Sequence, residues 1–366
     1  MPSLAWMISM PLNKLIGDEL YQINLILWML QPSKGIPVKP LLAQAGFRIK
    51  DIEVELPLPV SLKNRLAANH IAVSDPVTPD IVMARKGGEY VLAECKKSMF
   101  GSGSTGAEPS SQIKQARSLL LQIPRILESA LGLHPGSVVK SSVVYLSRED
   151  STKDQLKGIK EIDSALGGAG YETAACGLLV LRVQNKEIVA SAEQSDALGG
   201  TMKDVFGKGV VVHSVQDDET DPRPLYIVPW MPGGSSDSDD YGQAVFGNRV
   251  LAAAAACIGL CRPACDVEVG IDELLSAATQ GHFKLWKKKS VRKALRSNVK
   301  KLIEEVLKKF APDIVADDLI HPGQGWKISI PDDRAQSMVV EGFRKWQAQK
   351  WNERPVPLLF DKEDTQ

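Results

Sequence analysis

The 366-residue sequence has no net charge, no long hydrophobic run and few cysteines, and each absence excludes a class of protein. Its 44 Lys and Arg balance its 44 Asp and Glu, so any electrostatic recognition of nucleic acid must be local. The longest hydrophobic stretches, LYQINLILWML and VLAAAAACIGLC, fall short of the roughly 20 residues that span a bilayer. We therefore expect no membrane partner.

Cysteine and histidine are also scarce. Five cysteines, odd in number and unevenly spaced, argue against a disulfide framework and for a reducing cytoplasm. The first ten residues lack the basic start of a secretory signal. The five scattered histidines support neither a zinc site nor a Ser-His-Asp arrangement. Cys257, Cys261 and Cys265 are spaced four apart, but the run AAAAACIGLC is typical of a buried helix in which free cysteine packs as a small hydrophobe.

Length and composition predict two domains. Residues 1–232 alternate between helical and strand-like patterns, including an amphipathic helix at 12–30 and a helix at 112–130 kinked at Pro124. Residues 233–242 have the Gly, Ser and Asp composition of a linker, and residues 243–366 are mainly helical. The predicted fold class is α/β with a second, mainly helical domain.

The stretch TPDIVMARKGGEYVLAECKKS, residues 78–98, carries the candidate site. Two strand-like runs flank a Gly-Gly pair that supplies a tight reversal. Period-two alternation places Glu94 and Lys96 on one face of the second strand, and the reversal brings Asp80 near Glu94. Two carboxylates this close repel each other unless a cation intervenes, and Mg²⁺ prefers such oxygen ligands. Lys96 could then orient or deprotonate a metal-bound water for attack on a phosphodiester.

Pro79-Asp80 followed by Glu94-Cys95-Lys96 resembles the PD-(D/E)xK nuclease superfamily. An acid, any residue and then Lys occurs once in the chain, one hairpin after one of its three Pro-Asp pairs. The resemblance extends to the strand SSVVYLS and implies the αβββαβ core of restriction endonucleases. It implies that Asp80, Glu94 and the backbone carbonyl of Cys95 bind Mg²⁺ (or Mn²⁺), and that Lys96 assists the water. The alternative is a surface hairpin with solvated charges.

Three further candidate residues come from helices. In this family an additional acid often comes from the first helix, where Glu19 is the best-placed candidate, and the helix dipole explains a first-turn acid equally well. Gln112 and Gln115 open the helix after the Glu-x-Lys strand, where some relatives use a glutamine. A polar helix face is the other explanation for these glutamines.

The second domain contains a strongly basic helix. From Gly281 to Phe310 there are eleven Lys or Arg and only two acids. The order of elements resembles a winged-helix domain, and a basic helix anchored by its apolar face could lie against a DNA backbone. A solvated charged face on a helical bundle is the alternative. The candidate nucleic-acid-binding residues are Lys289, Arg292, Lys293, Arg296 and Lys300.

Together these patterns predict a metal-dependent DNA endonuclease of restriction, anti-phage defence or repair, with DNA and other subunits of such a system as partners. The competing hypothesis is a non-catalytic DNA-binding or scaffold subunit that uses a nuclease-like fold, and RNA is an alternative substrate. A homodimer would suit double-strand cleavage.

Overall fold

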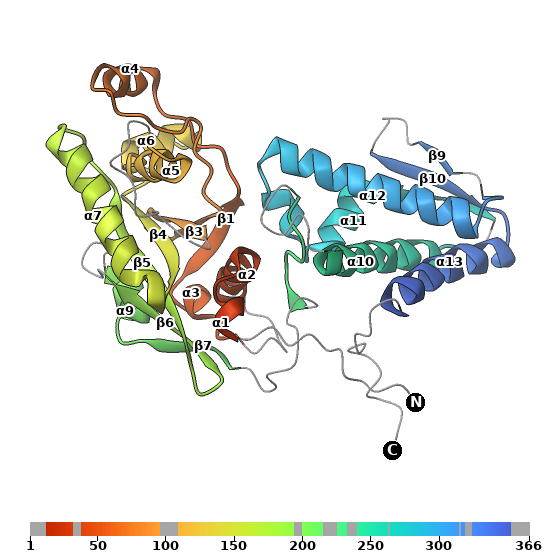
Figure 1. Cartoon of the computed structure of the whole chain (residues 1–366). Coiled ribbons are helices and arrows are strands. Elements are labelled where there is room, and N and C mark those ends of the chain that lie inside the picture. Colours follow the sequence, from red (N-terminus) through yellow and green to blue (C-terminus); the bar gives the residue numbers. More distant parts are fainter. Residues whose placement is uncertain are drawn as a thin grey trace. The chain divides into compact units, whose positions relative to one another are not determined.

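The structure is a computed structural model of the chain. It describes residues 12–31, 38–95, 109–193, 200–214, 225–232, 240–262, 264–314, 316–318 and 324–352. Contacts divide the chain into two compact units, and each is described by itself (Figure 1). The α/β unit comprises Pro11–Asp218 together with the short segment Leu285–Lys288, and the helical unit takes the remaining described residues.

The α/β unit is a mixed sheet covered by helices. Its elements are, in chain order, α1 (Leu12–Leu15), α2 (Glu19–Leu30), α3 (Leu41–Gln44), β1 (Phe47–Ile52), α4 (Val60–Ala68), β2 (Ile81–Arg85), β3 (Glu89–Cys95), α5 (Ser111–Leu120), α6 (Pro124–Ala130), β4 (Lys140–Arg148), the 3₁₀ helix η1 (Glu149–Ser151), α7 (Thr152–Gly168), β5 (Ala175–Gln184), β6 (Glu187–Glu193), α9 (Gly200–Phe206) and β7 (Val210–Ser214).

The seven strands of this unit are ordered β1-β2-β3-β4-β5-β6-β7. Strand β4 runs parallel to both β3 and β5, and the remaining neighbours pair antiparallel. A parallel pair requires a crossover connection, and helices supply one at each parallel step. α5 and α6 connect β3 to β4, and α7 connects β4 to β5.

The turn between β2 and β3 fixes the hairpin that carries the candidate site. Gly87 and Gly88 have φ values of 99° and 79°, which favour glycine over any residue with a side chain. A Cβ at Gly88 would also lie 2.7 Å from the carbonyl oxygen of Ser137. The turn sets a register in which Ile81 pairs with Ala93.

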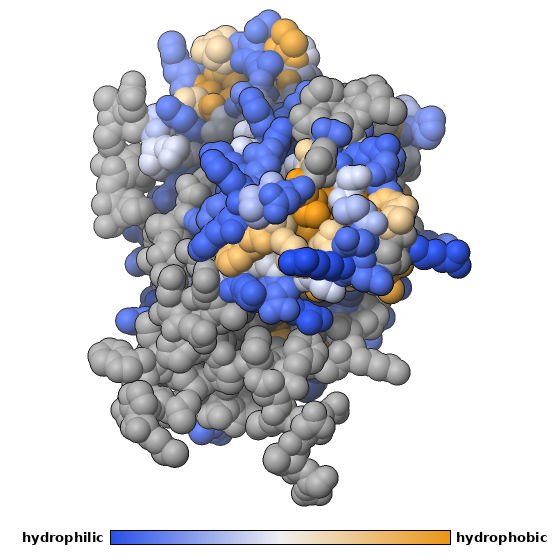
Figure 2. Space-filling model, turned by 90° about the vertical axis from the view of Figure 1, so that its right-hand side faces the viewer, coloured by the Kyte–Doolittle hydropathy of each residue, from blue (hydrophilic) through white to orange (hydrophobic). Residues whose placement is uncertain are grey.

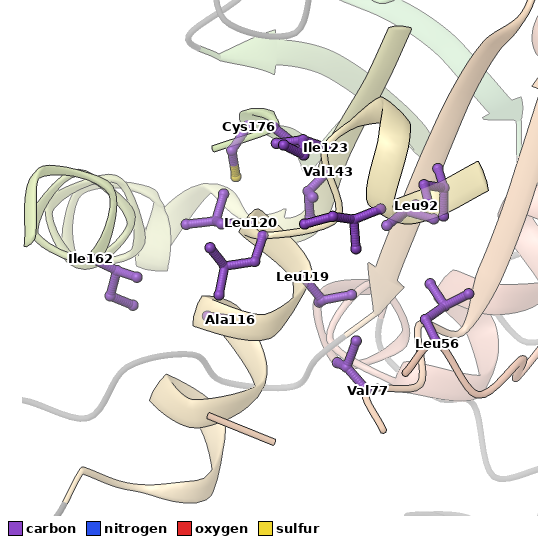
Figure 3. Close-up of a cluster of buried hydrophobic side chains, with 14 of the residues drawn as sticks. Leu56, Val77, Leu92, Ala116, Leu119, Leu120, Ile123, Val143, Ile162 and Cys176 are labelled. Atoms are coloured by element: carbon purple, nitrogen blue, oxygen red, sulfur yellow. The ribbon is translucent and has the colours of Figure 1, made fainter. Parts of the chain in front are cut away.

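Helix α5 packs its apolar side on one face of this sheet (Figure 3). Ala116 and Leu119 of α5 belong to one buried cluster with Leu92 of β3, Val143 of β4 and Ile162 of α7. The alternating residues of the central strands supply the sheet side of the cluster, as period-two geometry requires. This core holds α5 against the end of the hairpin.

The helix expected at 12–30 is in fact two helices, α1 and α2. Asp18 separates them and caps α2, because its side chain accepts a hydrogen bond from the backbone N–H of Tyr21 at 2.7 Å. Every residue from Leu20 to Leu30 is buried, so α2 is enclosed on all sides rather than amphipathic. The helix expected at 112–130 is likewise divided, since Pro124 begins α6 as a separate helix.

The helical unit combines long helices with a small sheet. Its elements are α10 (Asp240–Gly259), β8 (Cys265–Gly270), α11 (Ile271–Ala278), the 3₁₀ helix η3 (His282–Leu285), α12 (Lys289–Phe310), β9 (Ala316–Asp318), β10 (Gly325–Ile330) and α13 (Asp333–Asn352). The last residue of η3, Leu285, belongs to the segment assigned to the α/β unit. The sheet is antiparallel in the order β8-β10-β9. Of the expected linker at 233–242, residues 233–239 lie outside the described residues, and the last three open α10.

Figure 2 shows a largely hydrophilic face with a small hydrophobic group near its middle. Within the described ranges, no helix is long and apolar enough to cross a membrane.

Candidate functional site

The two carboxylates expected to bind a metal lie at the open end of the β2–β3 hairpin. The register pairs Ile81 with Ala93, and continuing it by one residue sets Asp80 opposite Glu94. Residues that face each other across an antiparallel pair project to the same side of the sheet. Both acids are buried, with exposed fractions of 9% for Asp80 and 1% for Glu94.

A hydrogen bond joins the beginning of β2 to the end of β3. The Oδ2 atom of Asp80 accepts from the backbone N–H of Cys95 at 2.6 Å. This contact fixes the Asp80 carboxylate beside the residue that follows Glu94. Cys95 is itself fully buried, so the main chain at this point is held within the sheet.

Gln115 of α5 also belongs to this site. Its Nε2 atom donates to Oε1 of Glu94 at 2.7 Å, and it lies 3.5 Å from the carbonyl oxygen of Thr78. Alternation along β3 explains the contact, because Glu94 shares a face with Tyr90 and Leu92, which pack in the cluster beneath α5. Gln115 is therefore more than part of a polar helix face, since it fixes the orientation of the Glu94 carboxylate.

Tyr145 of β4 is paired with Glu94 in the parallel ladder. Burial raises the pKa of the Tyr145 hydroxyl well above its usual range, and the charges of Cys176 and Glu94 raise it further. Tyr145 therefore stays protonated at neutral pH and adds no second negative charge beside Glu94.

Two of the other expected residues lie within the described ranges. Glu19 is the first residue of α2. This helix packs against β1 and β3, and none of its described residues belongs to the buried cluster beneath α5. Gln112 is half-buried in the first turn of α5. Lys96 lies outside the described residues.

Glu53 is a buried acid that sequence reasoning missed. Its backbone N–H donates to the carbonyl oxygen of Asp80 at 3.0 Å, so it lies directly beside the candidate site. Its side chain accepts from Nε1 of Trp286 at 2.5 Å and from Nζ of Lys288 at 3.1 Å. Its φ of 46° is unusual for a residue with a side chain. The indole and the amine thus fix this carboxylate.

Asp51 is a second buried acid at the same end of β1. Nζ of Lys287 lies 3.4 Å from its Oδ1, and the backbone N–H of Lys287 donates to the carbonyl oxygen of Ile52 at 2.9 Å. Burial raises the pKa of Asp51, and the Lys287 charge partly opposes that increase. No local pattern could reveal these contacts, because Glu53 and Trp286 are 233 residues apart in the sequence.

The carboxylates of Asp80 and Glu94 fit a hard divalent cation. Both are oxygen donors, and they face the same side of the sheet. Within the described residues, no cluster of three or more His, Cys, Asp and Glu side chains could hold a metal ion. A Mg²⁺ or Mn²⁺ ion here would take these two carboxylates, a main-chain oxygen such as that of Cys95, and water. Mg²⁺ commonly binds with so few protein ligands.

The basic helix α12 divides its cations into two groups. Arg296 makes a bidentate contact with Asp272 at 2.8 and 2.7 Å, and Arg292 lies 3.9 Å from the same carboxylate. Both guanidinium groups also lie over the ring of Phe283, at 4.8 Å for Arg292 and 5.7 Å for Arg296. These two arginines are therefore held within the unit.

The lysines of α12 are more accessible. Lys289 and Lys293 are exposed, and Lys300 lies 3.6 Å from Glu304 one turn along the helix. The apolar side of the helix is buried, including Val291 and Leu295. The helix therefore presents Lys289 and Lys293 to solvent while its opposite side packs in the unit.

Searches against protein-family models, curated proteins and solved structures found no match to this chain. Its chemistry is therefore inferred from the residues and their geometry.

Proposed function

We propose that the α/β unit is a metal-dependent deoxyribonuclease that hydrolyses phosphodiester bonds. The observation that carries the proposal is the juxtaposition of Asp80 and Glu94 on one hairpin, with Gln115 bonded to Glu94. Burying two acids side by side is costly unless a cation compensates them. A divalent cation does so and also supports phosphodiester hydrolysis.

The order of elements supports the same interpretation. Apart from the additional helices α3, α4 and α6, the succession α2, β1, β2, β3, α5 and β4, with β3 parallel to β4, matches the αβββαβ order that the sequence resemblance implies. Asp80 immediately precedes the second strand, β2, and Glu94 lies on the third, β3. In that family the Pro-Asp and Glu-x-Lys elements occupy corresponding places. The order of elements and the two acids both support the assignment to the PD-(D/E)xK superfamily that we propose.

In this proposal each residue has a separate role. Asp80, Glu94 and the backbone carbonyl of Cys95 would hold the cation, which would supply Lewis-acid activation of water and of the phosphate. Lys96 follows Cys95 directly and orients the attacking water. Gln115 fixes the Glu94 carboxylate through its hydrogen bond, and the bond from the Cys95 N–H does the same for Asp80. Glu19 is a further candidate ligand on α2.

The helical unit would hold the DNA. Its order of helix, strand, two helices and two strands, with sheet order β8-β10-β9, suits a winged-helix domain. Lys289 and Lys293 would contact phosphates directly, and Lys300 would extend the same basic surface. Arg292 and Arg296 would contribute only if DNA displaced Asp272. We place this activity in restriction, anti-phage defence or repair in the cytoplasm, with a homodimer as the form that cuts both strands.

A cleavage assay tests the proposal. The purified chain is incubated with plasmid DNA, single-stranded DNA and RNA, with Mg²⁺, Mn²⁺ or EDTA. Wild-type protein should cut DNA with either metal and be inactive in EDTA, and Asp80→Asn, Glu94→Gln and Lys96→Ala should each lose most of the cleavage activity. Glu161→Gln is the matched control, because Glu161 is an exposed acid on α7.

The assay also separates the competing hypotheses. DNA binding without cleavage by the wild-type protein, under all metal conditions, would support the non-catalytic scaffold. Cleavage of RNA alone would keep the chemistry and change the substrate. Full metal-dependent activity of Asp80→Asn would refute the assignment of the site.

A further inference from the structure

Cys261 and Cys265 form a pair of thiols in the helical unit. Their Sγ atoms lie 3.2 Å apart, and neither cysteine is in a disulfide. The third cysteine of this part of the sequence, Cys257, lies on α10 and is exposed. The spacing of four residues does not place all three along one helix, because α10 ends at Gly259 and Cys265 is the first residue of β8. Cys261 and Cys265 therefore meet although they do not belong to one helix.

The main chain around each thiol is held by other parts of the unit. Nε2 of Gln336, on α13, donates to the carbonyl oxygens of Ile258 at 2.7 Å and Cys261 at 2.9 Å. Cys265 is held in the sheet, where it is paired with Ile330 of β10. The proximity of the two sulfur atoms is therefore a property of the fold.

Solvent can reach both thiols. Each side chain is partly exposed, whereas Cys95 and Cys176 of the α/β unit are buried. The hydrogen bond with Cys261 raises the pKa of the Cys265 thiol, and burial adds to that effect. The Cys265 thiol also lies within hydrogen-bonding distance of the carbonyl oxygen of Arg262, to which it donates.

We propose that Cys261 and Cys265 are a redox-active pair that closes reversibly to a disulfide when a low-molecular-weight disulfide is present. A covalent S–S bond is about 2.05 Å long, so the sulfur atoms need to approach by only about 1.2 Å. The thiolate of one cysteine attacks the small disulfide, which releases one small thiol and leaves a mixed disulfide. The second cysteine then attacks the protein sulfur of that mixed disulfide and releases the other small thiol. Two protein thiols have lost two electrons and two protons, and one small disulfide has become two thiols.

Closure would fasten the end of α10 to the beginning of β8. α10 contacts α11, α12 and α13 as well as β8, so the bond would restrain the helix to which most of the unit is packed. The exposed and reversible character of the pair suits a reducing compartment in which the bond forms only under oxidative stress. This inference does not depend on the proposed nuclease activity.

The test measures how the fold changes the equilibrium of the pair. The full chain is equilibrated in mixtures of reduced and oxidised glutathione, in native buffer and in urea, and free thiols are then blocked and located by mass spectrometry of the peptides. Because the fold holds the sulfur atoms together, the bond should form in native buffer at least tenfold more favourably than in urea, a shift of about 30 mV.

Variants show which sulfur atoms react. Cys257→Ser should form the internal bond as the wild type does, and it is the matched control. Cys261→Ser and Cys265→Ser should instead carry a glutathione adduct on the remaining thiol of the pair. Equal equilibria in native buffer and urea, or an internal bond that uses Cys257, would overturn the proposal.

Discussion

In the α/β unit, Asp80, Glu94 and Glu53 are each less than 10% exposed, with fractions of 9%, 1% and 6%. In the helical unit, the paired side chains of Arg296 and Asp272 are 41% and 51% exposed. These three carboxylates of the α/β unit are therefore buried, whereas this ion pair of the helical unit lies at the surface.

The difference matters because burial determines how much free energy a charged side chain costs the folded state. A buried charge loses its hydration and depends on fixed partners, whereas a surface pair contributes about 0–1 kcal/mol. Glu53 has the Trp286 indole and the Lys288 amine as partners, and Glu94 accepts from the amide of Gln115. A carboxylate buried at such cost is expected to be kept for function, whereas surface charges can change with little effect on folding.

The largest expected effect is on the activity of Glu94→Gln. Glutamine keeps the volume of the side chain and an acceptor for Gln115, but it removes the charge that would hold a cation. We expect DNA cleavage to fall by about 10³-fold, the order reported for removing one electrostatic element from an active site. Because a buried charge disappears, the free energy of unfolding should stay the same or rise.

Denaturant unfolding and cleavage rates, measured on the same preparations, check both halves of this prediction. Glu161→Gln on the surface of α7 should change neither quantity. Loss of activity together with a large loss of stability would mean that Glu94 is a structural acid, and the contrast between function and folding would not hold.

The β2–β3 hairpin shows what local sequence determines. The strand expected at Glu89–Cys95 is β3 with the same bounds, because the Gly-Gly turn and the alternation of side chains are both local signals. Helix α2 shows the limit of such signals. Its apolar residues suggested one exposed side, but the fold encloses the helix completely, which periodicity over a dozen residues cannot reveal.

The candidate site was predictable to a similar extent. Glu94 lies on β3 and Asp80 immediately precedes β2, so a single hairpin brings them together. Gln115 contacts Glu94 from α5, a helix that is separated from the hairpin in the sequence. The sequence alone allowed two explanations for this glutamine, a role in the site or a place on a polar helix face. Glu53 could not be found at all, because its partner Trp286 lies in the other half of the sequence and joins β1 only in the folded chain.

Acid should weaken the α/β unit through His213. Nδ1 of His213 is hydrogen-bonded to the Tyr21 hydroxyl at 2.7 Å, and burial lowers the pKa of the imidazole to about 4. The unfolded chain has the ordinary histidine pKa of about 6.5, so between pH 6.5 and 4 it binds a proton that the folded chain does not. Stability should therefore fall as the pH falls through this window, by up to about 3 kcal/mol.

His213→Gln removes this titration and should make unfolding less sensitive to pH between 7 and 4. Urea unfolding at a series of pH values measures the difference in slope between variant and wild type. His134→Gln is the matched control, because His134 is exposed and its replacement should leave the slope unchanged. Parallel pH profiles for wild type and His213→Gln would exclude the buried imidazole as the cause.

A smaller loss of stability is expected for Glu53. Glu53→Ala removes the acceptor of the Trp286 indole and the partner of Lys288, and should cost about 1–3 kcal/mol. Glu53→Gln keeps an acceptor for the indole and should cost less. Thermal unfolding of both variants shows which loses more stability, and Glu161→Ala serves as the surface control. An alanine variant as stable as the wild type would show that this buried acid contributes nothing to folding.

The smallest effect on folding is expected at Asp272, where the surface charges of the helical unit meet. The hydrogen bond from Arg296 lowers the pKa of Asp272, so the stabilisation that it gives is present above the carboxylate's ordinary pKa and is lost as the pH falls through the lowered value. Asp272→Asn should lower the free energy of unfolding by at most about 1 kcal/mol, because the ion pair with Arg296 is exposed. Part of this loss comes from the position of Asp272 at the start of α11, where a negative charge interacts favourably with the helix dipole.

DNA binding by the same variant should change in the opposite direction. Without the carboxylate, Arg296 can turn toward a phosphate, so affinity measured by fluorescence anisotropy at several salt concentrations should rise and its salt dependence should steepen. Lys293→Gln is the companion variant, and it should weaken binding and reduce the salt slope by about one. If Asp272→Asn leaves affinity unchanged while Lys293→Gln lowers it, the lysines alone form the DNA-binding face, and the arginines of α12 serve only to hold α11 and η3 in place.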